Sequence, residues 1–433
     1  MDTKKVLIIT YYFPPRPGVA SLRLRGLARY LTEFGWDHVI LTADLPGEPE
    51  CRFKVIQTPY PGDVSALLKK KLHLNSNAGF QEQIGIPLAI REGRKSFTSR
   101  IITFIKELIA YPDEQKYWYP IAVKTGMKIM QEGNFKAIIS SSGPVTTHLI
   151  ARELKRKYNI PWIADLRDLW TQNHYYQYGS LRKILERRLE VKTLDYADAL
   201  VTVSEPLTKT LGTLHYKKPI FAIPNGYDPD ELNMIDTKIP LTKEFTITYT
   251  GQLYQAKRDP ELLLRAIKEL IDESIIKSDN IRVNFFGPTQ YWLEQEIKKY
   301  RLEEVVKQYG VVSREVALRK QRESQILLLL NWDDPDERGV YTGKIFEYLA
   351  AKRPILAIGG PKGVISELLL ETSTGFHSSD LESLKFFIIK CYKDYRKNSQ
   401  VQYCGKIDKI KKYSHYEMAK KFSRVLENII NKK

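Results

Sequence analysis

Cysteine is scarce in this sequence: Cys51, Cys391 and Cys404 are the only three in 433 residues, and they show no paired spacing. That distribution argues against a disulfide framework and against a zinc site, because both need clustered cysteines. We therefore expect a protein of a reducing compartment, the cytoplasm.

Long hydrophobic runs are also missing. A membrane-spanning helix needs roughly 18 to 20 consecutive apolar residues, and no run in the sequence approaches that length. Met1 to Lys5 leads into only four or five apolar residues, fewer than the apolar core of a signal peptide. We expect any membrane contact to be peripheral, at the inner face of the cytoplasmic membrane.

Acidic charge falls short of basic charge, with 51 Asp and Glu against 68 Lys and Arg and a formal net charge of +17. The excess is uneven: residues 381–433 hold 14 basic and 5 acidic residues, and residues 51–110 hold 10 and 4. Such an excess favours an anionic partner, namely a membrane surface, nucleic acid or a phosphorylated substrate. A solvated basic surface is the alternative.

Apolar runs alternate with amphipathic stretches in two successive series. The expected strands lie at residues 6–10, 39–42, 137–140, 162–164, 199–203 and 220–223, and then at 245–250, 281–286, 325–330 and 355–358. This order predicts an α/β protein with parallel sheets. We expect a first domain at 1–226, a linker at 227–243, a second domain at 244–410, and a basic C-terminal helix at 411–433 that crosses back to the first domain.

The first strand-to-helix loop contains Gly18 and several prolines but no G-x-G-x-x-G, so a nicotinamide dinucleotide site is not supported.

Two stretches at residues 67–74 and 97–109 combine Lys and Arg with Leu, Ile and Phe. Peripheral membrane docking is one interpretation of them. Helices packed on the sheet with solvated lysines are the other, and both stay open.

The stretch RGVYTGKIFEYLAAKRPILAIGG at residues 338–360 has the pattern of a loop, a helix, a strand and a second loop. A helix that begins there offers free backbone N–H groups from Thr342 to Lys344, the Lys344 ammonium and the positive end of the helix dipole. Together these suit a phosphate. Glu347, one turn further on, can accept hydrogen bonds from sugar hydroxyls. An ordinary surface helix is the alternative.

Taken together, these features resemble the retaining glycosyltransferases of family 4, which have the GT-B architecture. The resemblance rests on the opening strand, Pro-rich loop, glycine and helix, on IPNGYDPD at 223–230, on YTGQLYQAKRDP at 249–260 and on EYLAAKRPILA at 347–357. It covers almost the whole chain. It implies two Rossmann-like domains whose parallel sheets face a central cleft, the first binding the acceptor and the second the nucleotide-sugar donor.

The resemblance assigns donor-binding roles in the second domain. In the family, a glycine after the first strand of this domain is followed by Arg and, six residues after the glycine, by Lys, and both reach the donor pyrophosphate. Gly251 and Lys257 match, whereas Gln252 stands at the Arg place and Arg258 is the neighbour that can substitute for it. Gly287 follows the next strand and is a further donor candidate, because ligands sit beyond the carboxyl ends of parallel strands.

The family often has two glutamates eight residues apart, the second of which binds the donor ribose. Glu347 fits that second place, while Gly339 stands at the first. Some members instead place a Lys two residues into a turn before Glu-Tyr, as Gly343 and Lys344 do here. We therefore take Thr342, Gly343, Lys344 and Glu347 as donor-binding residues.

In the first domain, Asp165 and Asp168 stand at a strand end near the expected acceptor side. One of them can orient or partly deprotonate the acceptor hydroxyl. The alternative is that one of them caps a turn and pairs with Arg167. Gly18 resembles the family's glycine that lines the donor diphosphate, and Lys257 is the third residue to which we assign a catalytic role.

We expect a hexosyltransferase-like enzyme that moves a sugar from a nucleotide diphosphate sugar to a glycan or lipid-linked acceptor, in polysaccharide or lipopolysaccharide biosynthesis. The resemblance implies retention at the anomeric carbon and no metal or other cofactor; the Asp-x-Asp spacing at Asp228 and Asp230 lies in the expected linker. One alternative is a nucleotide-sugar epimerase on the same fold. Another is a nucleic-acid-binding protein, which the lack of aromatic residues interleaved with the basic ones argues against.

Overall fold

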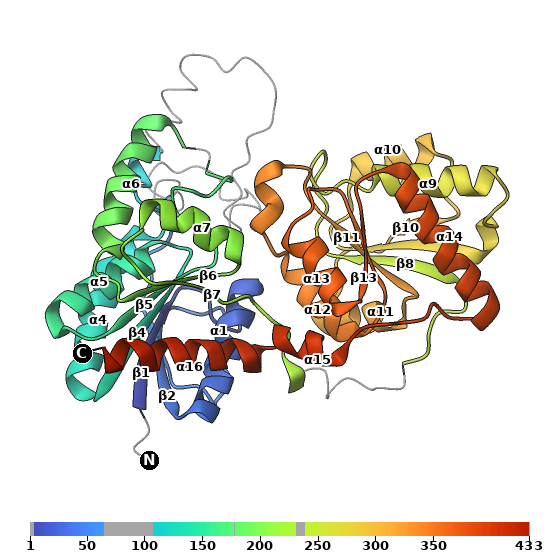
Figure 1. Cartoon of the computed structure of the whole chain (residues 1–433). Helices are drawn as coiled ribbons and strands as arrows, with labels where there is room; N and C mark the ends of the chain where they lie inside the picture. Colours follow the sequence, from blue (N-terminus) through green and yellow to red (C-terminus); the bar gives the residue numbers. More distant parts are fainter. Residues whose placement is uncertain (1–3, 65–106, 177, 231–238, 433) are drawn as a thin grey trace. The chain divides into compact units, whose positions relative to one another are not determined.

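The computed structural model describes residues 4–64, 107–176, 178–230 and 239–432. The chain forms two compact units, residues 1–223 with 419–433, and residues 224–418 (Figure 1). Unit 1 thus ends close to the predicted boundary at residue 226 and also contains the C-terminal residues from Ala419 onward. Of the two predicted basic helices, the one at 67–74 lies outside the described residues, as does the other up to residue 106.

Unit 1 is built on a seven-stranded parallel sheet with the order β3-β2-β1-β4-β5-β6-β7. Its strands are β1 (Lys4–Thr10), β2 (Trp36–Ala43), β3 (Val55–Thr58), β4 (Phe135–Ser142), β5 (Trp162–Leu166), β6 (Ala199–Thr202) and β7 (Ile220–Ala222). The chain first adds strands on one side of β1 and then on the other. The strand order therefore reverses between β1 and β4, the place where open α/β sheets leave a crevice at their carboxyl ends.

Helices cover both faces of this sheet (Figure 1). The described helices of unit 1 are α1 (Val19–Leu31), α4 (Tyr119–Glu132), α5 (Thr146–Tyr158), α6 (Ser180–Leu194), α7 (Glu205–Leu214) and most of α16 (His415–Asn431). Residues of α4 and α5 join one core with alternate strand residues such as Leu7 and Ile9. On the other face α1 meets α16, since the Arg23 guanidinium lies 5.4 Å from the centre of the Phe422 ring.

Unit 2 is built on a six-stranded parallel sheet with the order β10-β9-β8-β11-β12-β13. The strands are β8 (Phe245–Thr250), β9 (Ile281–Phe286), β10 (Val306–Gln308), β11 (Ile326–Leu330), β12 (Ile355–Ile358) and β13 (Gly375–Ser378). Here the order reverses between β8 and β11. The carboxyl ends of these two strands therefore frame the corresponding crevice of unit 2.

The described helices of unit 2 include α9 (Glu261–Asp272), α10 (Tyr291–Lys299), α11 (Arg314–Glu323), α12 (Gly343–Ala351), α13 (Val364–Thr372), α14 (Leu381–Asn398) and the short α15 (Ile407–Ile410). Side chains of a strand point alternately to its two faces. Ile326, Leu328 and Leu330 of β11 accordingly pack in the core with α9, α10 and α14, whereas Leu327 and Leu329 pack in the core with α12 and α13. This apolar strand is buried on both faces, as parallel strands are.

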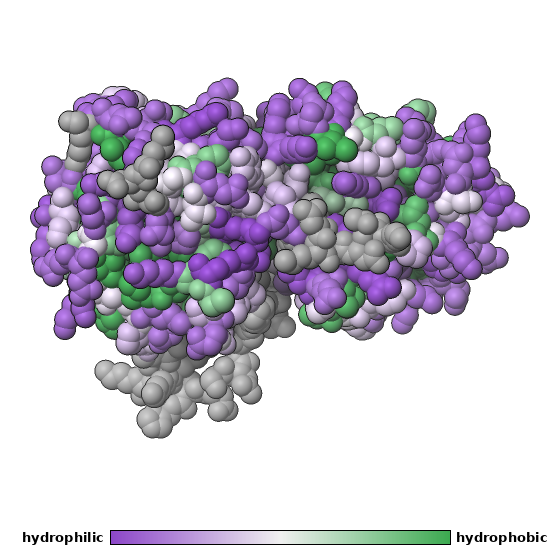
Figure 2. Space-filling model, turned by 90° about the horizontal axis from the view of Figure 1, so that it is seen from below, coloured by the Kyte–Doolittle hydropathy of each residue, from purple (hydrophilic) through white to green (hydrophobic). Residues whose placement is uncertain are grey.

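The fold class predicted from the sequence, an α/β protein with two parallel-sheet domains, is confirmed. In the part of the chain that the structure describes, no helix has the length and apolar character needed to span a membrane. Figure 2 shows one face of each unit, covered mostly by hydrophilic residues with hydrophobic residues in smaller groups.

Candidate functional site

The loops that follow β8 and β11 meet at the strand-order reversal of unit 2. Lys257 lies in the loop after β8 and Trp332 lies two residues beyond the end of β11, and the Lys257 ammonium is 4.1 Å from the centre of the Trp332 ring. This contact joins the two loops across the place where α/β sheets bind ligands. The sequence analysis missed Trp332, because only the strand order brings it beside Lys257.

Gly251 and Gly287 allow the ends of β8, β9 and α12 to approach one another closely. Gly251 has φ +132°, and a Cβ atom added there would lie 2.2 Å from Cε of Lys344. A Cβ atom at Gly287 would lie 2.1 Å from the carbonyl oxygen of Gly251. At Gly287 the clash is with backbone, which cannot move aside; at Gly251 the Lys344 side chain could move, but the positive φ disfavours any other residue, so both predicted donor-site positions favour glycine.

Lys344 occupies the first turn of α12, as predicted, with its ammonium 5.2 Å from the centre of the Tyr249 ring. Burial and, to a smaller extent, the positive charge of Arg258 lower the pKa of Lys344 to about 8, while Glu347 acts in the opposite direction. Two cations held close together in a poorly solvated place disfavour the charged form of Lys344. An anion bound beside them would remove that cost.

The start of α12 adds unbonded donors to these cations. Thr342 is the N-cap residue, is 9% exposed, and its hydroxyl oxygen has no hydrogen-bond partner among the described residues. Gly343 and Lys344 follow in the first turn, where backbone N–H groups point out of the helix and the dipole favours negative charge. The three predicted residues thus place N–H groups and an ammonium next to Gly251, an arrangement that suits an anion.

Glu347 is already held by two side chains of α11. Its Oε1 accepts a hydrogen bond of 2.6 Å from Arg314, and its Oε2 accepts one of 3.3 Å from Gln321. Gln321 also donates to the Thr250 hydroxyl at 2.9 Å, which ties Glu347 to the end of β8. A carboxylate has about four acceptor positions, so Glu347 can still accept bonds from sugar hydroxyls. Arg314 and Gln321 carry no sequence signal for this role.

The loop between Gly251 and Arg258 is fixed by its own contacts. The Tyr249 hydroxyl donates to the backbone carbonyl of Gln252 at 2.8 Å. The Arg258 guanidinium lies 5.6 Å from the centre of the Tyr254 ring, and its charge reaches Lys344. Arg258 is therefore close enough to supply positive charge where Gln252 replaces the expected arginine.

At the carboxyl edge of the sheet of unit 1, Asp165 is buried and forms an ion pair with Arg23. Both of its oxygens accept hydrogen bonds from Arg23, at 2.9 and 3.2 Å, and Oδ2 also accepts one of 2.8 Å from the Ser141 hydroxyl. With 0% of its surface exposed, Asp165 does not reach an acceptor in this structure. This arrangement favours the structural alternative, with Arg23 as the partner in place of Arg167, while the catalytic role of Asp165 stays an untested prediction.

Asp168 is exposed two residues beyond the end of β5. Burial lowers the pKa of the neighbouring Arg167, and the charge of Asp168 acts in the opposite direction. Gly18, the N-cap residue of α1, is exposed with φ +121° and has open space on the side where a Cβ atom would point. Asp168 thus stays a candidate at the acceptor side and Gly18 a candidate for a close ligand approach.

A second Asp-x-Asp sequence, at Asp334 and Asp336, follows β11 directly, and the sequence analysis overlooked it. Asp334 accepts a hydrogen bond of 2.9 Å from the backbone N–H of Asp336 and caps a short 3₁₀ helix, Pro335–Gly339. Among the described residues, no group of three or more His, Cys, Asp or Glu side chains is arranged to hold a metal ion. Asp334 is thus engaged in a local turn.

Comparison with known proteins gives a match of one part of the chain to a family model, and a fold for the whole chain. Residues 88–231 match the family model of Glycosyltransferase Family 4. No curated protein matches the chain in sequence.

Solved structures align with nearly the full chain. Sucrose-phosphate synthase from Thermosynechococcus elongatus is similar with a TM-score of 0.62 and 13% identity, covering 99% of this chain and 100% of that one. HepE of Anabaena in complex with UDP is similar with a TM-score of 0.59 and 13% identity, covering 98% of this chain and 100% of that one. TarM of S. aureus, solved with fondaparinux, alpha-GlcNAc-glycerol and UDP, has a TM-score of 0.60 and 11% identity, covering 99% of this chain and 100% of that one. At these identities the structures establish the shared fold, which is GT-B.

Proposed function

We propose that the chain is a family 4 glycosyltransferase and that it transfers a hexose from a nucleotide diphosphate sugar to an acceptor hydroxyl with retention of configuration; the match of residues 88–231 to that family's model and the shared GT-B fold support this. HepE and TarM were solved with UDP, so a uridine nucleotide is the first donor to test. The acceptor that we propose is a glycan or a lipid-linked saccharide of polysaccharide or lipopolysaccharide biosynthesis, reached at the inner face of the cytoplasmic membrane.

The observation that carries this proposal is the cationic edge of unit 2. Lys344, Arg258 and Lys257 gather where the strand order reverses, beside the start of α12. When the bond between the sugar and the nucleotide breaks, negative charge builds up on the leaving diphosphate. Cations and backbone amides placed there beforehand stabilise that charge more than they stabilise the ground state, which is the requirement for rate acceleration.

We assign separate roles to the residues around the diphosphate. Lys257 and Lys344 neutralise the leaving group, Arg258 substitutes for the family's missing arginine at Gln252, and no metal is needed to carry the charge. Glu347, oriented by Arg314, accepts hydrogen bonds from the donor ribose.

On the acceptor side we retain Asp168 as the group that orients the attacking hydroxyl. In a retaining reaction without a protein nucleophile, the leaving phosphate itself takes the acceptor proton on the same face of the sugar. From the family resemblance alone we also keep Gly18 as a donor-binding residue; it has φ +121° and open space where a Cβ atom would point.

Binding of nucleoside diphosphates tests the proposal directly. Thermal unfolding is followed with UDP, GDP, ADP and CDP, because a ligand at 100 times its dissociation constant stabilises a protein by about 2.7 kcal/mol. One of them is expected to stabilise the wild-type chain, and Lys344→Ala is expected to abolish that gain. Lys277→Ala, which removes an exposed lysine of the same unit, serves as the matched control.

Product analysis then fixes the reaction class. With donor and acceptor together, a new glycoside with the donor's anomeric configuration is expected. An isomerised donor sugar formed without acceptor would instead identify an epimerase. Tight binding of duplex DNA or RNA at physiological salt, with no stabilisation by any nucleoside diphosphate, would overturn the proposal altogether.

A further inference from the structure

Helix α6 of unit 1 buries three of its charged residues. Arg182, Glu186 and Glu190 are buried, at 2%, 2% and 0% exposure. Most surface helices bury their apolar residues and expose their charges. A helix that also buries charges must pair them, because an unpaired buried charge is strongly destabilising.

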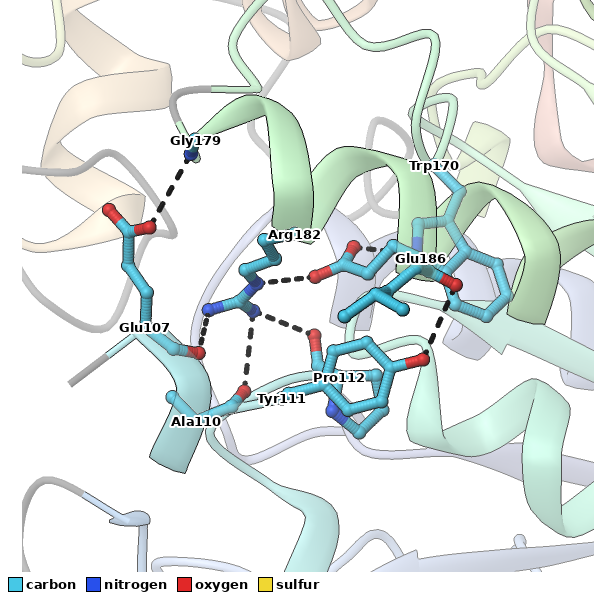
Figure 3. A network of polar contacts seen from close by, with 9 residues as sticks. Glu107, Ala110, Tyr111, Pro112, Trp170, Gly179, Arg182 and Glu186 are labelled. Atoms are coloured by element: carbon cyan, nitrogen blue, oxygen red, sulfur yellow. Dashed lines mark hydrogen bonds and ion pairs between the residues drawn. The ribbon is translucent and has the colours of Figure 1, made fainter. Parts of the chain in front are cut away.

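The buried charges of α6 do have partners (Figure 3). Arg182 donates a hydrogen bond of 2.6 Å to Glu186 and further bonds to the backbone carbonyls of Glu107, Ala110 and Pro112. Glu186 also accepts a bond of 3.1 Å from the Trp170 indole N–H.

Farther along the helix, Glu190 accepts hydrogen bonds from the backbone N–H and the hydroxyl of Thr171. These bonds fix the rotation of α6 about its axis, so its other face must point outward.

That outer face combines apolar and basic residues. Leu181 is 56% exposed, Ile184 51%, Val191 40% and Leu185 37%. The charged residues exposed between them, all within the described helix, are basic: Lys183, Arg187, Arg188 and Lys192.

A hollow of about 450 Å³ lies on this face. It is lined by Ile184, Arg187, Arg188, Val191 and Lys192 of α6 together with Leu214 at the end of α7. Just beyond α6, the side chain of Asp195 lies 3.7 Å from the Lys218 ammonium, so this acidic group does not neutralise the outer face. The surface therefore offers apolar contact and positive charge at the same place.

We propose that this outer face of α6 docks onto a membrane surface that contains anionic lipids. Helices that lie in a membrane interface bury apolar side chains at the boundary of the acyl chains and keep Lys and Arg among the anionic head groups. A second copy of the chain bound through the same face would set four cations against four cations. An anionic bilayer matches both the charge and the exposed apolar side chains.

This inference rests on the proposed function only in that a lipid-linked acceptor gives the enzyme a reason to be at the membrane. Its test measures binding to vesicles and is independent of sugar transfer. The full chain is sedimented with vesicles of phosphatidylcholine, with and without phosphatidylglycerol. Binding is expected only with phosphatidylglycerol, and it is expected to weaken as salt is added.

The variant Arg187→Gln/Arg188→Gln removes two positive charges from the exposed face. At about 1 kcal/mol for each basic residue near an anionic membrane, the partition coefficient is expected to fall about 30-fold. Ile184→Ser, which removes an exposed apolar side chain, is expected to weaken binding without changing the salt dependence. Lys124→Gln/Lys128→Gln on α4 makes the same change of charge on exposed residues and is expected to have little effect.

Equal losses for the α4 and α6 variants would overturn the proposal, and so would equal binding to neutral vesicles. A dimer of the wild-type chain that Ile184→Ser dissociates, with no vesicle binding, would identify a second copy as the partner instead. Thermal stabilisation by the nucleoside diphosphate is measured on each variant. It is expected to be unchanged, so failure of the docking proposal leaves the proposed function untouched.

Discussion

The two sheets reverse their strand order in the same way, between β1 and β4 in unit 1 and between β8 and β11 in unit 2, but the two edges differ in charge. At the first edge the buried Arg23 and Asp165 neutralise each other. At the second, Lys344 and Arg258 lie close enough for the charge of one to lower the pKa of the other. The shared topology thus provides a crevice in each unit, and the placement of charge decides which ligand the crevice suits.

The physical consequence is a division of tasks. A neutral hydroxyl needs orientation and one hydrogen-bond acceptor, which the exposed Asp168 can supply at the first edge. A diphosphate needs several cations and N–H donors, which the second edge concentrates around the start of α12. Four changes break or sharpen this contrast.

Removing the ammonium of Lys344 is expected to have the largest effect. Lys344→Ala should lower kcat/KM for transfer about 10²- to 10³-fold, the loss that follows removal of one group that stabilises transition-state charge. Lys257→Ala and Glu347→Ala are each expected to abolish most transfer as well. Steady-state kinetics with circular dichroism as a check of folding measures this. Turnover near the wild-type value in all three variants would remove the donor-site assignment from unit 2.

Breaking the Arg23–Asp165 ion pair of unit 1 should lower the stability of the fold and should not act on the chemical step of transfer. Asp165→Asn leaves the buried Arg23 charge uncompensated, which is expected to cost about 3 kcal/mol of unfolding free energy in urea denaturation. The exposed Asp168→Asn is expected to leave stability within about 0.5 kcal/mol while it slows transfer. An Asp165→Asn protein of normal stability and low activity would restore the catalytic role for Asp165.

Much of the fold follows from apolar runs in the sequence, because a strand that is buried on both faces must be apolar along its length. Val6 to Thr10 and Phe245 to Thr250 were predicted as strands and are strands. The edge strands β3, β10 and β13 were not predicted, since they are short and partly exposed and hence lack such a run.

The donor-site candidates were located by local patterns: a glycine after a strand, a lysine in a helix start. Their partners were not, because Arg314, Gln321 and Trp332 reach the site from elements that only the strand order brings near. The ion pair of Asp165 was not predicted for the same reason: its partner Arg23 lies 142 positions away in the sequence. Residue type indicated a carboxylate at a strand end, but burial decided its role.

The pKa of Lys344 makes the contrast dependent on pH. In the free protein this pKa is lowered to about 8, and a bound diphosphate should raise it, so binding takes up a proton. Affinity for the nucleoside diphosphate is therefore expected to fall by up to tenfold per pH unit above about pH 8. Isothermal titration between pH 7 and pH 9 measures the slope. Lys344→Met should bind weakly with a flatter profile, and an unchanged slope in that variant would assign the proton to another group.

In the free protein, Lys344 makes the folding stability rise with pH, whereas the affinity for the diphosphate falls with pH. Because the folded pKa lies below the unfolded value near 10.5, the folded state binds fewer protons between those two values. Its contribution to stability consequently rises with pH across that window. Bound diphosphate should flatten this rise.

The smallest effect is expected at Trp332, whose ring lies 4.1 Å from the Lys257 ammonium. A cation–π contact at a partly exposed site contributes about 0.5 to 1 kcal/mol, so Trp332→Leu should raise the KM for the donor roughly two- to fivefold with little change in kcat. Trp332→Phe keeps an aromatic face and should recover most of the loss. If the ring acts by positioning Lys257, Trp332→Leu must have no further effect in a Lys257→Ala background, since the double-mutant cycle then contains a single shared interaction. Additive losses would mean that the Trp332 ring contacts the donor independently of Lys257. Lys257 would then be positioned without help from the loop that follows β11.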